Sequence, residues 1–366
     1  MSADVQSDID GDRKSRVEYS ELARTLIAAG HRAEVLDYES VDSDRRPLIA
    51  LARRFLGRPF ALALLAYLRR HECDAYFTSG ETAVVPLAVL LKLCRNRPGH
   101  VGLAYEMSKP KTRFFFRWLR IHRQTDMTFV YCGAQRDYAI NALRIPADRV
   151  TLVFGHVDAR FYRPLGGPPP APNSLCSAGI AKRDYATLVL ALTGVPEAKL
   201  TAVPAGHPLS LNRRAIPNLP IPPNVNFPDY EPGGLRDLYA SAAIVCVALN
   251  EGMSAAGVTT LLEAMAMAKP VIVTRSTGLA DYLRDGETGL YVAPGDVEGW
   301  KQAIRRLLND APLRERIGAN ARRWIEQNST LEMWAGAIVR ALVAAAARRQ
   351  APRSSAQDAS RPSRML

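Results

Sequence analysis

The sequence has few of the features that mark secreted, disulfide-bonded or membrane-spanning proteins. It contains no run of about 18 apolar residues, so we expect no membrane-spanning helix. Residues 1–16 are polar, whereas a secretory signal needs an apolar stretch near the N-terminus. The cysteines are odd in number and scattered among apolar neighbours: Cys73, Cys94, Cys132, Cys176 and Cys246. We therefore expect reduced core thiols in a cytoplasmic protein rather than disulfides or a metal site.

The composition indicates a globular protein with anionic partners. A chain of 366 residues is too long for one ordinary hydrophobic core, so we expect two domains. Hydrophobic residues make up 48% and charged residues 23%, which excludes a disordered protein. The net charge of +12 favours sugar nucleotides, lipid phosphates, a membrane surface or nucleic acid. Nucleic acid is the least favoured of these, because the basic residues are spread out and partly gathered in the C-terminal tail.

The most informative stretch is a pattern of strand, loop, helix and strand that ends at Thr274. Residues 243–249 are continuously apolar, as in a parallel strand buried on both faces. Gly257 allows the backbone to approach a ligand, and a helix beginning near Thr259 or Thr260 would present several unpaired N–H groups. Such a helix start attracts anions, and each contact to a charged oxygen contributes on the order of 1.5–3 kcal/mol. Two or three contacts would hold a diphosphate.

Glu263 lies about one turn into this helix and has two interpretations. A carboxylate at that position can accept hydrogen bonds from two neighbouring hydroxyl groups of a ligand. Alternatively, the segment from Thr260 to Glu263 fits the capping-box pattern, in which the Glu side chain bonds back to the backbone at the helix start. These four residues alone favour structural capping, but the motifs around them reverse that preference.

The surrounding motifs form a larger pattern. Residues 257–270, Gly278, the Asp-Gly-Glu-Thr-Gly-Leu-Tyr-Val segment at 285–292 and the Pro-Gly-Asp segment at 294–296 resemble the donor-binding half of a family-4 glycosyltransferase (glycosyl transferases group 1) of the GT-B fold. The resemblance implies an α/β protein with two doubly wound Rossmann-like domains facing a cleft. It also implies transfer of a hexose from a nucleotide-sugar donor to a carbohydrate or lipid-linked acceptor, with retention of configuration and without a cofactor or metal.

The same resemblance assigns roles to individual residues. Glu263 would bind the ribose of the donor. The loop and helix start before it would meet the diphosphate and the sugar through Gly257, Val258, Thr259 and Thr260. Phe227 lies in a short strand and loop that resemble the segment framing the nucleobase.

The cations that bind the donor phosphates differ from the usual pattern. Relatives have an Arg where this sequence has Ile180, so we expect Lys182 or Arg183 to supply the charge. Arg183 is preferred because its planar guanidinium suits two phosphate oxygens. An exposed arginine at a helix start is an equally open interpretation.

The expected catalytic residues are Glu251, Arg183 and Tyr105. Ala255 stands where many relatives have a Glu near the sugar, and Glu251 is the nearest alternative in the preceding loop. Tyr105 stands near the position of a His that contacts the donor sugar, but its phenol, with a pKa of about 10, stays neutral. Backbone N–H groups and one or two cations would stabilise the departing diphosphate.

The pattern of elements divides the chain into six parts. They are a disordered N-terminus (1–14), an acceptor-side Rossmann-like domain (15–165), a linker (166–173), a nucleotide-sugar-binding domain (174–330), a terminal helix crossing back to the first domain (331–349) and a disordered basic tail (350–366). No hydrophobic strand or glycine-rich loop precedes the helix expected at 17–29. We therefore expect the first sheet to lack a strand.

Two helical segments of the first domain are candidates for contact with a membrane surface. Residues 47–70 are expected to be mostly buried, with a helix skimming the membrane as the alternative. In residues 112–123 four arginines gather on one side and the aromatic residues on the other, which favours a helix packed on the sheet with a solvated basic face. The alternative is a basic face turned to anionic lipid or a phosphorylated acceptor, with the protein peripheral at the inner membrane face.

Two other functions stay open at this point. A non-catalytic sugar-nucleotide binder would keep Glu263 and its helix start while losing the catalytic set, as Ile180 and Ala255 suggest. A sugar-nucleotide epimerase of the same fold would change the sugar without any acceptor.

Overall fold

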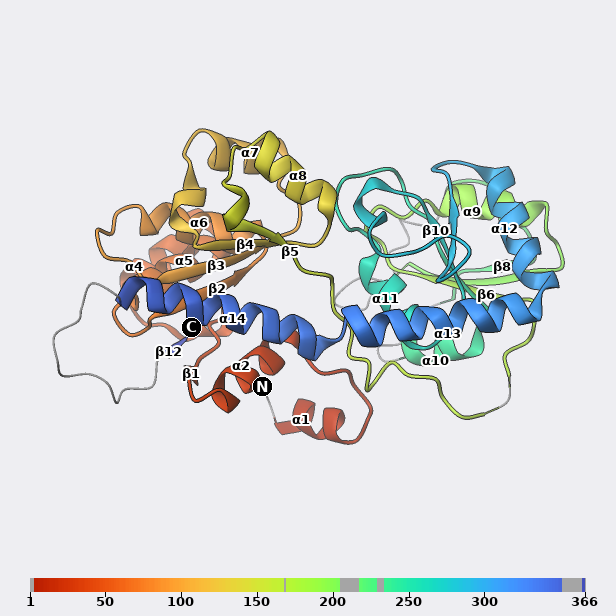
Figure 1. The fold of residues 1–366 in the computed structure, drawn as a ribbon, viewed down its shortest axis with the longest axis horizontal. Helices are drawn as coiled ribbons and strands as arrows, with labels where there is room; N and C mark the ends of the chain where they lie inside the picture. Colours follow the sequence, from red (N-terminus) through yellow and green to blue (C-terminus); the bar gives the residue numbers. More distant parts are fainter. Residues whose placement is uncertain (1–2, 168, 205–216, 229–233, 351–363, 366) are drawn as a thin grey trace. The chain divides into compact units, whose positions relative to one another are not determined.

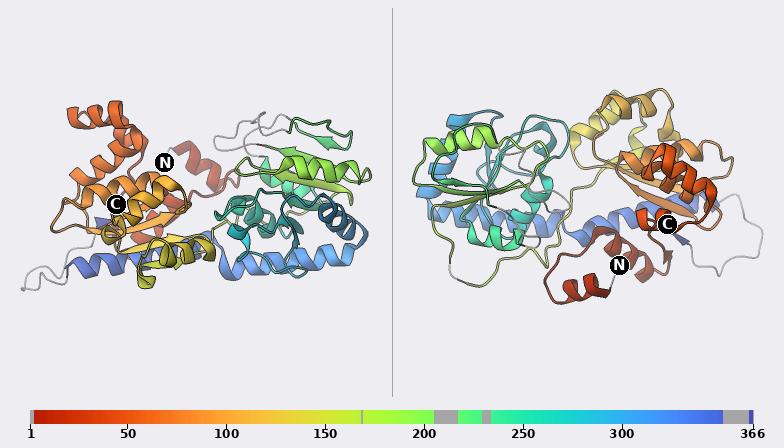
Figure 2. Two further views of the ribbon diagram at one scale, coloured as in Figure 1. Left: turned by 90° about the horizontal axis from the view of Figure 1, so that it is seen from above. Right: turned by 180° about the vertical axis from the view of Figure 1, so that it is seen from behind.

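The computed structural model describes residues 3–167, 169–204, 217–228, 234–350 and 364–365, and the chain forms two compact α/β units (Figure 1 and Figure 2). The N-terminal domain consists of residues 17–153 and of the chain from 332 onward, and the C-terminal domain of residues 1–16 and 154–331. Within the described residues, each domain contains a six-stranded parallel sheet. Two doubly wound domains of the GT-B type are the architecture that the sequence predicts.

In the C-terminal domain the strand order is β11-β10-β9-β6-β7-β8. The strands are β6 (Ser174–Ala178), β7 (Lys199–Val203), β8 (Val225–Asn226), β9 (Ile244–Val247), β10 (Val271–Thr274) and β11 (Leu290–Val292). The chain extends the sheet in one direction from β6 to β8 and in the other from β9 to β11. The order therefore reverses between β6 and β9, and ligands of such sheets bind at the carboxyl edge of this point.

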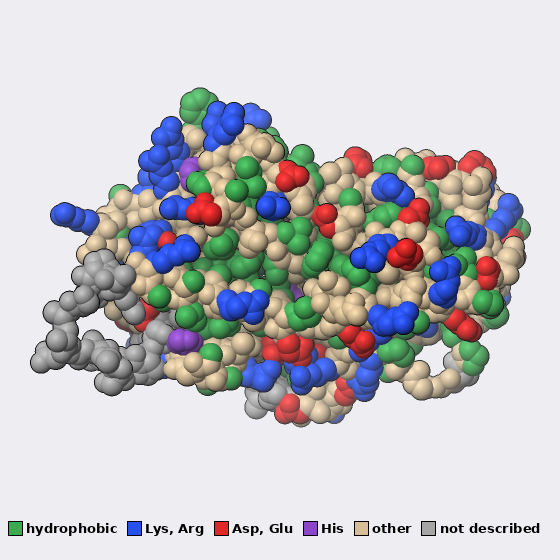
Figure 3. All heavy atoms as spheres, viewed as in Figure 1, with side chains coloured by type: hydrophobic (Ala, Val, Ile, Leu, Met, Phe, Trp, Pro, Cys, Tyr) green, Lys and Arg blue, Asp and Glu red, His purple; other side chains and the backbone are tan. Residues whose placement is uncertain are grey.

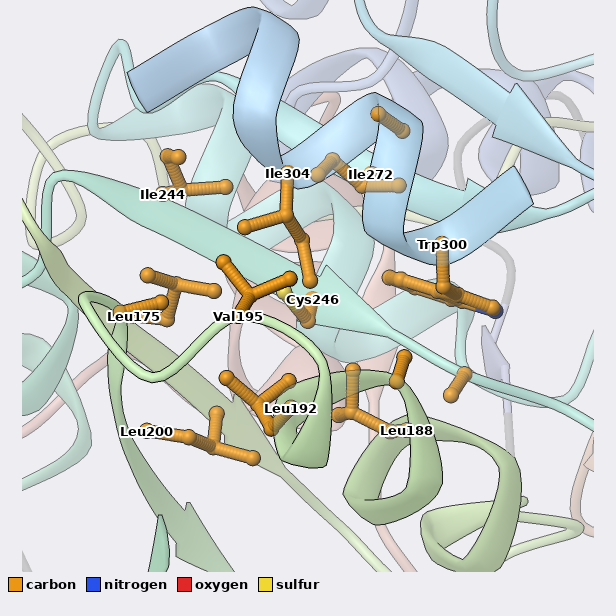
Figure 4. Packing of buried hydrophobic residues seen from close by; sticks show 14 of the residues in the cluster. Leu175, Leu188, Leu192, Val195, Leu200, Ile244, Cys246, Ile272, Trp300 and Ile304 are labelled. Carbon is orange, nitrogen blue, oxygen red and sulfur yellow. The ribbon is translucent and has the colours of Figure 1, made fainter. Parts of the chain in front are cut away.

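Helices cover both faces of this sheet. They are α9 (Tyr185–Thr193), α10 (Leu235–Ser241), α11 (Val258–Ala266), α12 (Val297–Asn309) and α13 (Ala311–Asn328). On one face, Ile304 of α12 lies next to Cys246 of β9, in a cluster that also contains Trp300 of α12 and Leu188 of α9 (Figure 4). On the other face, α11 and α13 pack against Val245 and Val247. Both faces of β9 are thus buried, which explains why its sequence is apolar without alternation.

In the N-terminal domain the strand order is β1-β12-β2-β3-β4-β5. The strands are β1 (Arg32–Ala33), β12 (Arg364–Met365), β2 (Ala75–Ser79), β3 (Gly99–Ala104), β4 (Met127–Val130) and β5 (Val150–Leu152). The helices are α2 (Glu18–Ala28), α3 (Tyr38–Ser43), α4 (Pro47–Leu56), α5 (Arg58–Leu68), α6 (Glu81–Leu91), α7 (Pro110–Arg117), α8 (Gly133–Asn141) and α14 (Leu331–Gln350). Short 3-10 helices are η1 (Ile121–Gln124) and η2 (Ala147–Arg149) in this domain, and η4 (Thr277–Leu279) in the C-terminal domain.

The strand position that the sequence predicts to be missing is partly filled by the end of the chain. β12 lies between β1 and β2 and pairs with both in parallel. Arg364 and Met365 therefore depart from the expected disordered tail, because an opening between two strands offers them backbone partners. The rest of that expectation, residues 351–363, lies outside the described residues.

The N-terminus also departs from the expected disorder. Residues 3–10 form helix α1 (Ala3–Asp10), and Asp12 accepts hydrogen bonds from Arg163 (2.8 Å) and Arg236 (3.0 Å). Arg16 donates to the buried carboxylate of Asp158 at 2.6 Å. The polarity of this segment predicts disorder only if its charges lack partners, and here the C-terminal domain supplies them.

The C-terminal domain begins at Phe154, earlier than the boundary at 165 that the sequence suggests. The ring of Phe154 packs edge-on against Tyr282 and Trp324, and the Gly155 N–H donates to the Tyr282 hydroxyl at 2.9 Å. These contacts bring the segment before the linker into the second core.

The segments expected at 47–70 and 112–123 are less buried than the sequence suggests. On α4 the apolar side chains of one face are exposed, namely Leu48, Leu51, Phe55 and Leu56. The second helix ends as α7 at Arg117, because Arg120 adopts a left-handed backbone with φ of 49°. Phe116 is buried, whereas Trp118 is 75% exposed. The aromatic residues therefore do not share one packed face, and no helix within the described residues is long and apolar enough to cross a membrane.

A buried ion pair fastens α14 to the N-terminal sheet. The Asp126 carboxylate accepts from Arg97 at 2.8 Å, from Arg349 of α14 at 2.6 Å and from the His100 N–H at 2.8 Å. Burial opposes ionisation of Asp126, but the Arg97 contact outweighs it and lowers the pKa of the carboxyl. Ala345 of α14 fits against Gly99, where a Cβ would lie 2.8 Å from the Ala345 backbone.

We predict that Asp126→Asn lowers the free energy of unfolding of the N-terminal domain by about 3–5 kcal/mol, because it leaves the buried Arg97 charge uncompensated. Urea denaturation at pH 7 measures the loss, with the exposed Asp137→Asn as the matched control. A loss below about 1 kcal/mol, the range of an exposed ion pair, would contradict the role given to this pair.

Candidate functional site

The predicted strand, loop, helix and strand are confirmed as β9, α11 and β10. Gly257 has a left-handed backbone with φ of 84° and precedes α11, which begins at Val258, one position before the expected start. Thr259 is exposed, and Thr260 is buried. The N–H groups of the first turn face the carboxyl edge where the strand order reverses, so this helix start is available to an anion.

The capping-box interpretation of Glu263 is wrong. Gly257 is the N-cap of α11 and receives no side-chain hydrogen bond there. Glu263 instead lies in the protein interior and accepts a hydrogen bond from the hydroxyl of Tyr239 in α10 at 2.8 Å. The side chain therefore does not stabilise the helix start.

Arg183 reaches from the loop after β6 to the first turn of α11. Its Nη2 donates to Thr260 Oγ1 at 2.8 Å, and its Nε donates to the Ala178 carbonyl at 2.7 Å. A Cβ added to Gly179 or to Gly257 would lie 2.6 Å or 2.9 Å from the guanidinium. Both glycines are therefore needed to make room for this side chain.

Burial and neighbouring side chains act in opposite directions on the charge of Arg183. Burial lowers the pKa of its guanidinium, while Tyr185, Tyr239 and Glu263 favour the charged form. The positive end of the α11 dipole lies beside the same cation. An anion bound between them would interact favourably with both, so the arrangement suits a phosphate group.

The carboxyl of Glu263 has an unusually high pKa. Burial raises the pKa of its carboxyl to about 7, although hydrogen bonds with Tyr239 and Tyr162 and the charge of Arg183 oppose the rise. A carboxylate at this position accepts hydrogen bonds only, whereas the protonated acid also donates one. Its affinity for hydroxyl groups of a ligand is therefore expected to change near neutral pH.

Glu251 is tied into the loop that carries it. Its Oε1 accepts from the N–H groups of Gly252 (2.9 Å) and Thr277 (3.1 Å). Burial disfavours its charge, but these contacts and the nearby Lys182 ammonium lower the pKa of the carboxyl on balance. Its carboxylate thus joins the loop after β9 to the loop after β10.

The loop joined by Glu251 packs tightly against η4. The Gly278 N–H donates to the Gly252 carbonyl at 2.9 Å, and a Cβ on Gly278 would lie 1.9 Å from the Ser254 carbonyl oxygen. Beside it the hydroxyl of Ser276 is buried and has no hydrogen-bond partner within the described part of the chain. A ligand at this edge would offer such a partner.

The other predicted residues are placed as follows. Lys182 has a left-handed backbone with φ of 53°, and its ammonium lies beside Gly252. Phe227 follows β8 and packs edge-on against Tyr185 with ring centroids 5.8 Å apart. Tyr105 belongs to the N-terminal domain, where its hydroxyl is 2.6 Å from Ser79 Oγ and its ring faces Tyr131. Within the C-terminal domain, the structure thus brings Arg183 and Thr260 together with the start of α11.

Sequence reasoning missed Tyr239 and Tyr162, which support Glu263. Both are buried aromatic residues and look like ordinary core positions in the sequence. The five cysteines are free thiols, and no group of three or more potential metal ligands occurs within the described residues.

We predict that Glu263→Gln stabilises the ligand-free protein at pH 8. With a folded pKa of about 7 against 4.5 for the ordinary group, ionising Glu263 costs up to about 3 kcal/mol above pH 7. The cost falls as the pH drops from 7 to 4.5 and vanishes below that, so the gain in Tm should follow the same course. Calorimetry from pH 5 to 8 measures it, with the exposed Glu315→Gln as control. A pH-independent loss of stability would instead indicate a purely structural residue.

Comparison with known proteins finds similarity to glycosyltransferases. Residues 184–324 match the model of the family described as glycosyl transferases group 1. Over 65 residues the chain is 45% identical to the capsular polysaccharide biosynthesis glycosyltransferase CapM of Staphylococcus aureus, covering 18% of this chain and 17% of that protein. Over 300 residues it is 26% identical to the sulfoquinovosyl transferase SQD2 of Arabidopsis thaliana, covering 74% and 57%. The chain thus spans less than three fifths of the length of these curated relatives.

Solved structures agree on the fold. A glycosyltransferase from Rickettsia africae superposes with a TM-score of 0.67 at 16% identity, covering 90% of this chain and 94% of that one. HepE of Anabaena, solved in complex with UDP and glucose, superposes with a TM-score of 0.62 at 18% identity, covering 77% and 81%. The chain therefore has the GT-B fold, and its residues 184–324 match the model of the glycosyl transferases group 1 family.

Proposed function

We propose that the protein is a glycosyltransferase of glycan biosynthesis that moves a hexose from a nucleotide-sugar donor to a carbohydrate or lipid-linked acceptor, with retention of configuration. The contact of Arg183 with the first turn of α11, one turn away from the buried Glu263, carries this proposal. It combines a cation, a helix start and a hydroxyl-binding carboxylate at the edge where the strand order reverses. HepE, which shares the fold, has been solved with UDP-glucose.

In this mechanism the C-terminal domain binds the donor through complementary charges. The N–H groups that follow Gly257 and the guanidinium of Arg183 hold the diphosphate, and Lys182 adds a second cation. Ionised Glu263 accepts hydrogen bonds from the two ribose hydroxyls, while Tyr239 keeps its carboxylate oriented. Phe227 lies beside Tyr185 at the edge proposed for the nucleobase.

The chemical step requires stabilisation of the negative charge that develops on the departing diphosphate. Donors already fixed in place do this without reorganisation. Arg183 is fixed by Thr260 and Ala178, so it is suited to this task without a metal ion. Glu251 and Tyr105 are the side chains that we assign to the sugar of the donor.

One observation favours a non-catalytic sugar-nucleotide binder as the second candidate. The Glu251 carboxylate accepts two backbone N–H groups of its own loops, as a structural side chain would. Such a protein would bind the donor without turning it over.

A peripheral contact with anionic membrane, at the cytoplasmic face, is part of the proposal. Figure 3 shows Lys and Arg side chains gathered over the part of the N-terminal domain where Figure 1 places α7. Phe114 and Trp118 are exposed in the same segment. Exposed aromatic residues beside arginines are typical of a surface that meets lipid headgroups.

Nucleotide binding is tested by a thermal-shift panel of UDP, GDP, ADP and CMP on the wild type and Glu263→Ala. A nucleotide at about 100 times its dissociation constant should stabilise the fold by about 2.7 kcal/mol. We expect one nucleotide to raise the Tm and the variant to lose most of the rise. If no nucleotide raises the Tm of the folded wild type, the donor site is not where we place it.

Binding of the matching nucleotide sugar should tighten as the pH rises from 6 to 8. The ionised fraction of Glu263 increases about tenfold from pH 6 to pH 8 for a pKa of about 7, and the apparent affinity follows the ionised fraction. The nucleotide sugar is preferred to the free diphosphate because it has no terminal phosphate that titrates near pH 6. Calorimetric titration of the wild type and of Glu263→Gln measures this affinity at each pH. The affinity of the variant should not change with pH, because it has no carboxyl group at this position.

Arg183→Ala should reduce the rate of sugar transfer by about 100- to 1000-fold, the effect of removing one fixed donor to developing charge. Arg183→Lys keeps the positive charge but loses the planar guanidinium, so its rate of sugar transfer should lie between those of Arg183→Ala and the wild type. The exposed Arg284→Ala in the same domain is the control. Turnover close to wild type in Arg183→Ala would remove this residue from the mechanism, and donor binding without turnover in the wild type would favour the second candidate.

A further inference from the structure

Residues 158–162 form a turn that packs in the same hydrophobic cluster as α11, the helix that carries Glu263. The Asp158 carbonyl accepts a hydrogen bond from the Tyr162 N–H at 2.8 Å, and the Tyr162 side chain is buried. Arg16 fixes the start of this turn, because its Nη2 donates to the Asp158 carboxylate at 2.6 Å. We call residues 158–162 the tyrosine turn.

Two tyrosines approach the Glu263 carboxyl group from different elements. Tyr239 of α10 donates to its Oε2 at 2.8 Å, and Tyr162 of the tyrosine turn hydrogen-bonds to the same carboxyl group. The ring centroids of the two tyrosines are 6.3 Å apart. An ionised carboxylate has about four acceptor positions. Two tyrosine hydroxyls therefore leave about two of these positions, which matches the pair of hydroxyl groups on a ribose.

Arg322 of α13 links the tyrosine turn to α11. Its Nη1 donates to the carbonyls of Ala159 (3.1 Å), Tyr162 (3.0 Å) and Ala266 (2.7 Å). Ala266 is the last residue of α11, where carbonyls have no partner within the helix. Helix α13 runs beside α11 (Figure 1), and Glu326 on the same helix accepts from the Arg322 Nε at 2.7 Å.

Capping of α11 alone would not require the contacts of Arg322 with the turn. Two of the three carbonyls that it binds belong to the tyrosine turn, so the guanidinium fixes the position of this turn relative to the helix. Hydrogen bonds from a hydroxyl to an oxygen acceptor extend over about 2.5–3.0 Å. A shift of the turn by about 1 Å would therefore separate the Tyr162 hydroxyl from the Glu263 carboxylate.

We propose that Arg322 and Tyr162 are positioning residues for the ribose of the donor. Arg322 keeps the tyrosine turn in register with α11, and Tyr162 acts with Tyr239 to fix the Glu263 carboxylate so that it faces two hydroxyl groups. The inference rests on the proposed function, in which Glu263 binds the ribose. It extends that function, because the preference for ribose over 2′-deoxyribose then depends on groups that do not touch the nucleotide.

The test compares the binding of ribonucleotides with that of their 2′-deoxy forms. UDP, GDP and ADP, and likewise dUDP, dGDP and dADP, are titrated in a calorimeter at pH 8, where Glu263 is mostly ionised. Loss of one hydrogen bond to a charged group should make the wild type bind the 2′-deoxy form of its nucleotide about 10- to 100-fold more weakly. We call this ratio of affinities the ribose discrimination.

Three variants measure the contribution of the turn. Tyr162→Phe should reduce the ribose discrimination about 3- to 10-fold, the range that one hydrogen bond contributes. Arg322→Met should reduce it by a similar factor, because the tyrosine turn loses its link to α11. Arg322→Lys keeps a group with three N–H donors and should restore part of the discrimination. If Arg322→Met does not fold, Tyr162→Phe still decides the question.

Two control variants separate positioning from stability. Tyr282→Phe removes a buried hydroxyl of the same domain that accepts from the Gly155 N–H, and Arg316→Met removes an exposed charge from α13. Both should leave the ribose discrimination unchanged, whatever their effect on Tm.

The outcomes for the proposal and for the proposed function are distinct. If Tyr162→Phe and Arg322→Met bind both forms of the nucleotide more weakly but keep the wild-type ribose discrimination, the positioning role is wrong and the proposed function stands. If the wild type binds both forms equally, Glu263 does not bind the ribose, and both proposals are overturned.

Discussion

The contact between Arg183 and the first turn of α11 joins the two halves of the C-terminal sheet at the point where the strand order reverses. Arg183 follows β6, and α11 follows β9, so the hydrogen bond to Thr260 spans the two directions of chain growth. Gly179 and Gly257 both have positive φ and both lie against the guanidinium. The loops after β6 and β9 therefore depend on each other: a side chain at either glycine would displace the arginine, and with it the charge beside the helix start.

Backbone hydrogen bonds also connect the loops after β6 and β9. The Lys182 carbonyl accepts from the Asn250 N–H, and the Asp184 N–H donates to the Ala248 carbonyl. Glu251 and Gly278 extend the same network to the loop after β10. Hydrogen bonds of the backbone and of the Glu251 side chain thus connect three loops at one edge and hold their backbones in fixed positions. Such rigidity is what stabilisation of developing charge requires.

The sequence predicts the parts of this arrangement that depend on periodicity and glycine, and misses those that depend on distant partners. The apolar run of β9, Gly257 and the helix after it are recognisable because burial on both faces and helix starts leave local patterns. The support of Glu263 by Tyr239 leaves none, since a buried tyrosine looks the same whether or not its hydroxyl serves a carboxylate. The order of residues 3–10 and the filling of a strand position by Arg364 and Met365 were likewise beyond local rules, because both depend on groups far away in the chain.

Buried charge is compensated by protein groups in the N-terminal domain but not in the C-terminal domain. The first arrangement contributes to stability, and the second is typical of a binding site. In the N-terminal domain Asp126 is matched by Arg97, Arg349 and a backbone N–H, so its charge is fully compensated. In the C-terminal domain burial raises the pKa of Glu263 and lowers that of Arg183, and Ser276 is buried with an unpaired hydroxyl within the described residues. Buried groups with disfavoured charges or unpaired hydroxyls do not stabilise the fold. A ligand carrying phosphate oxygens and hydroxyls would satisfy them together, which is why perturbed groups gathered at one sheet edge point to a binding site.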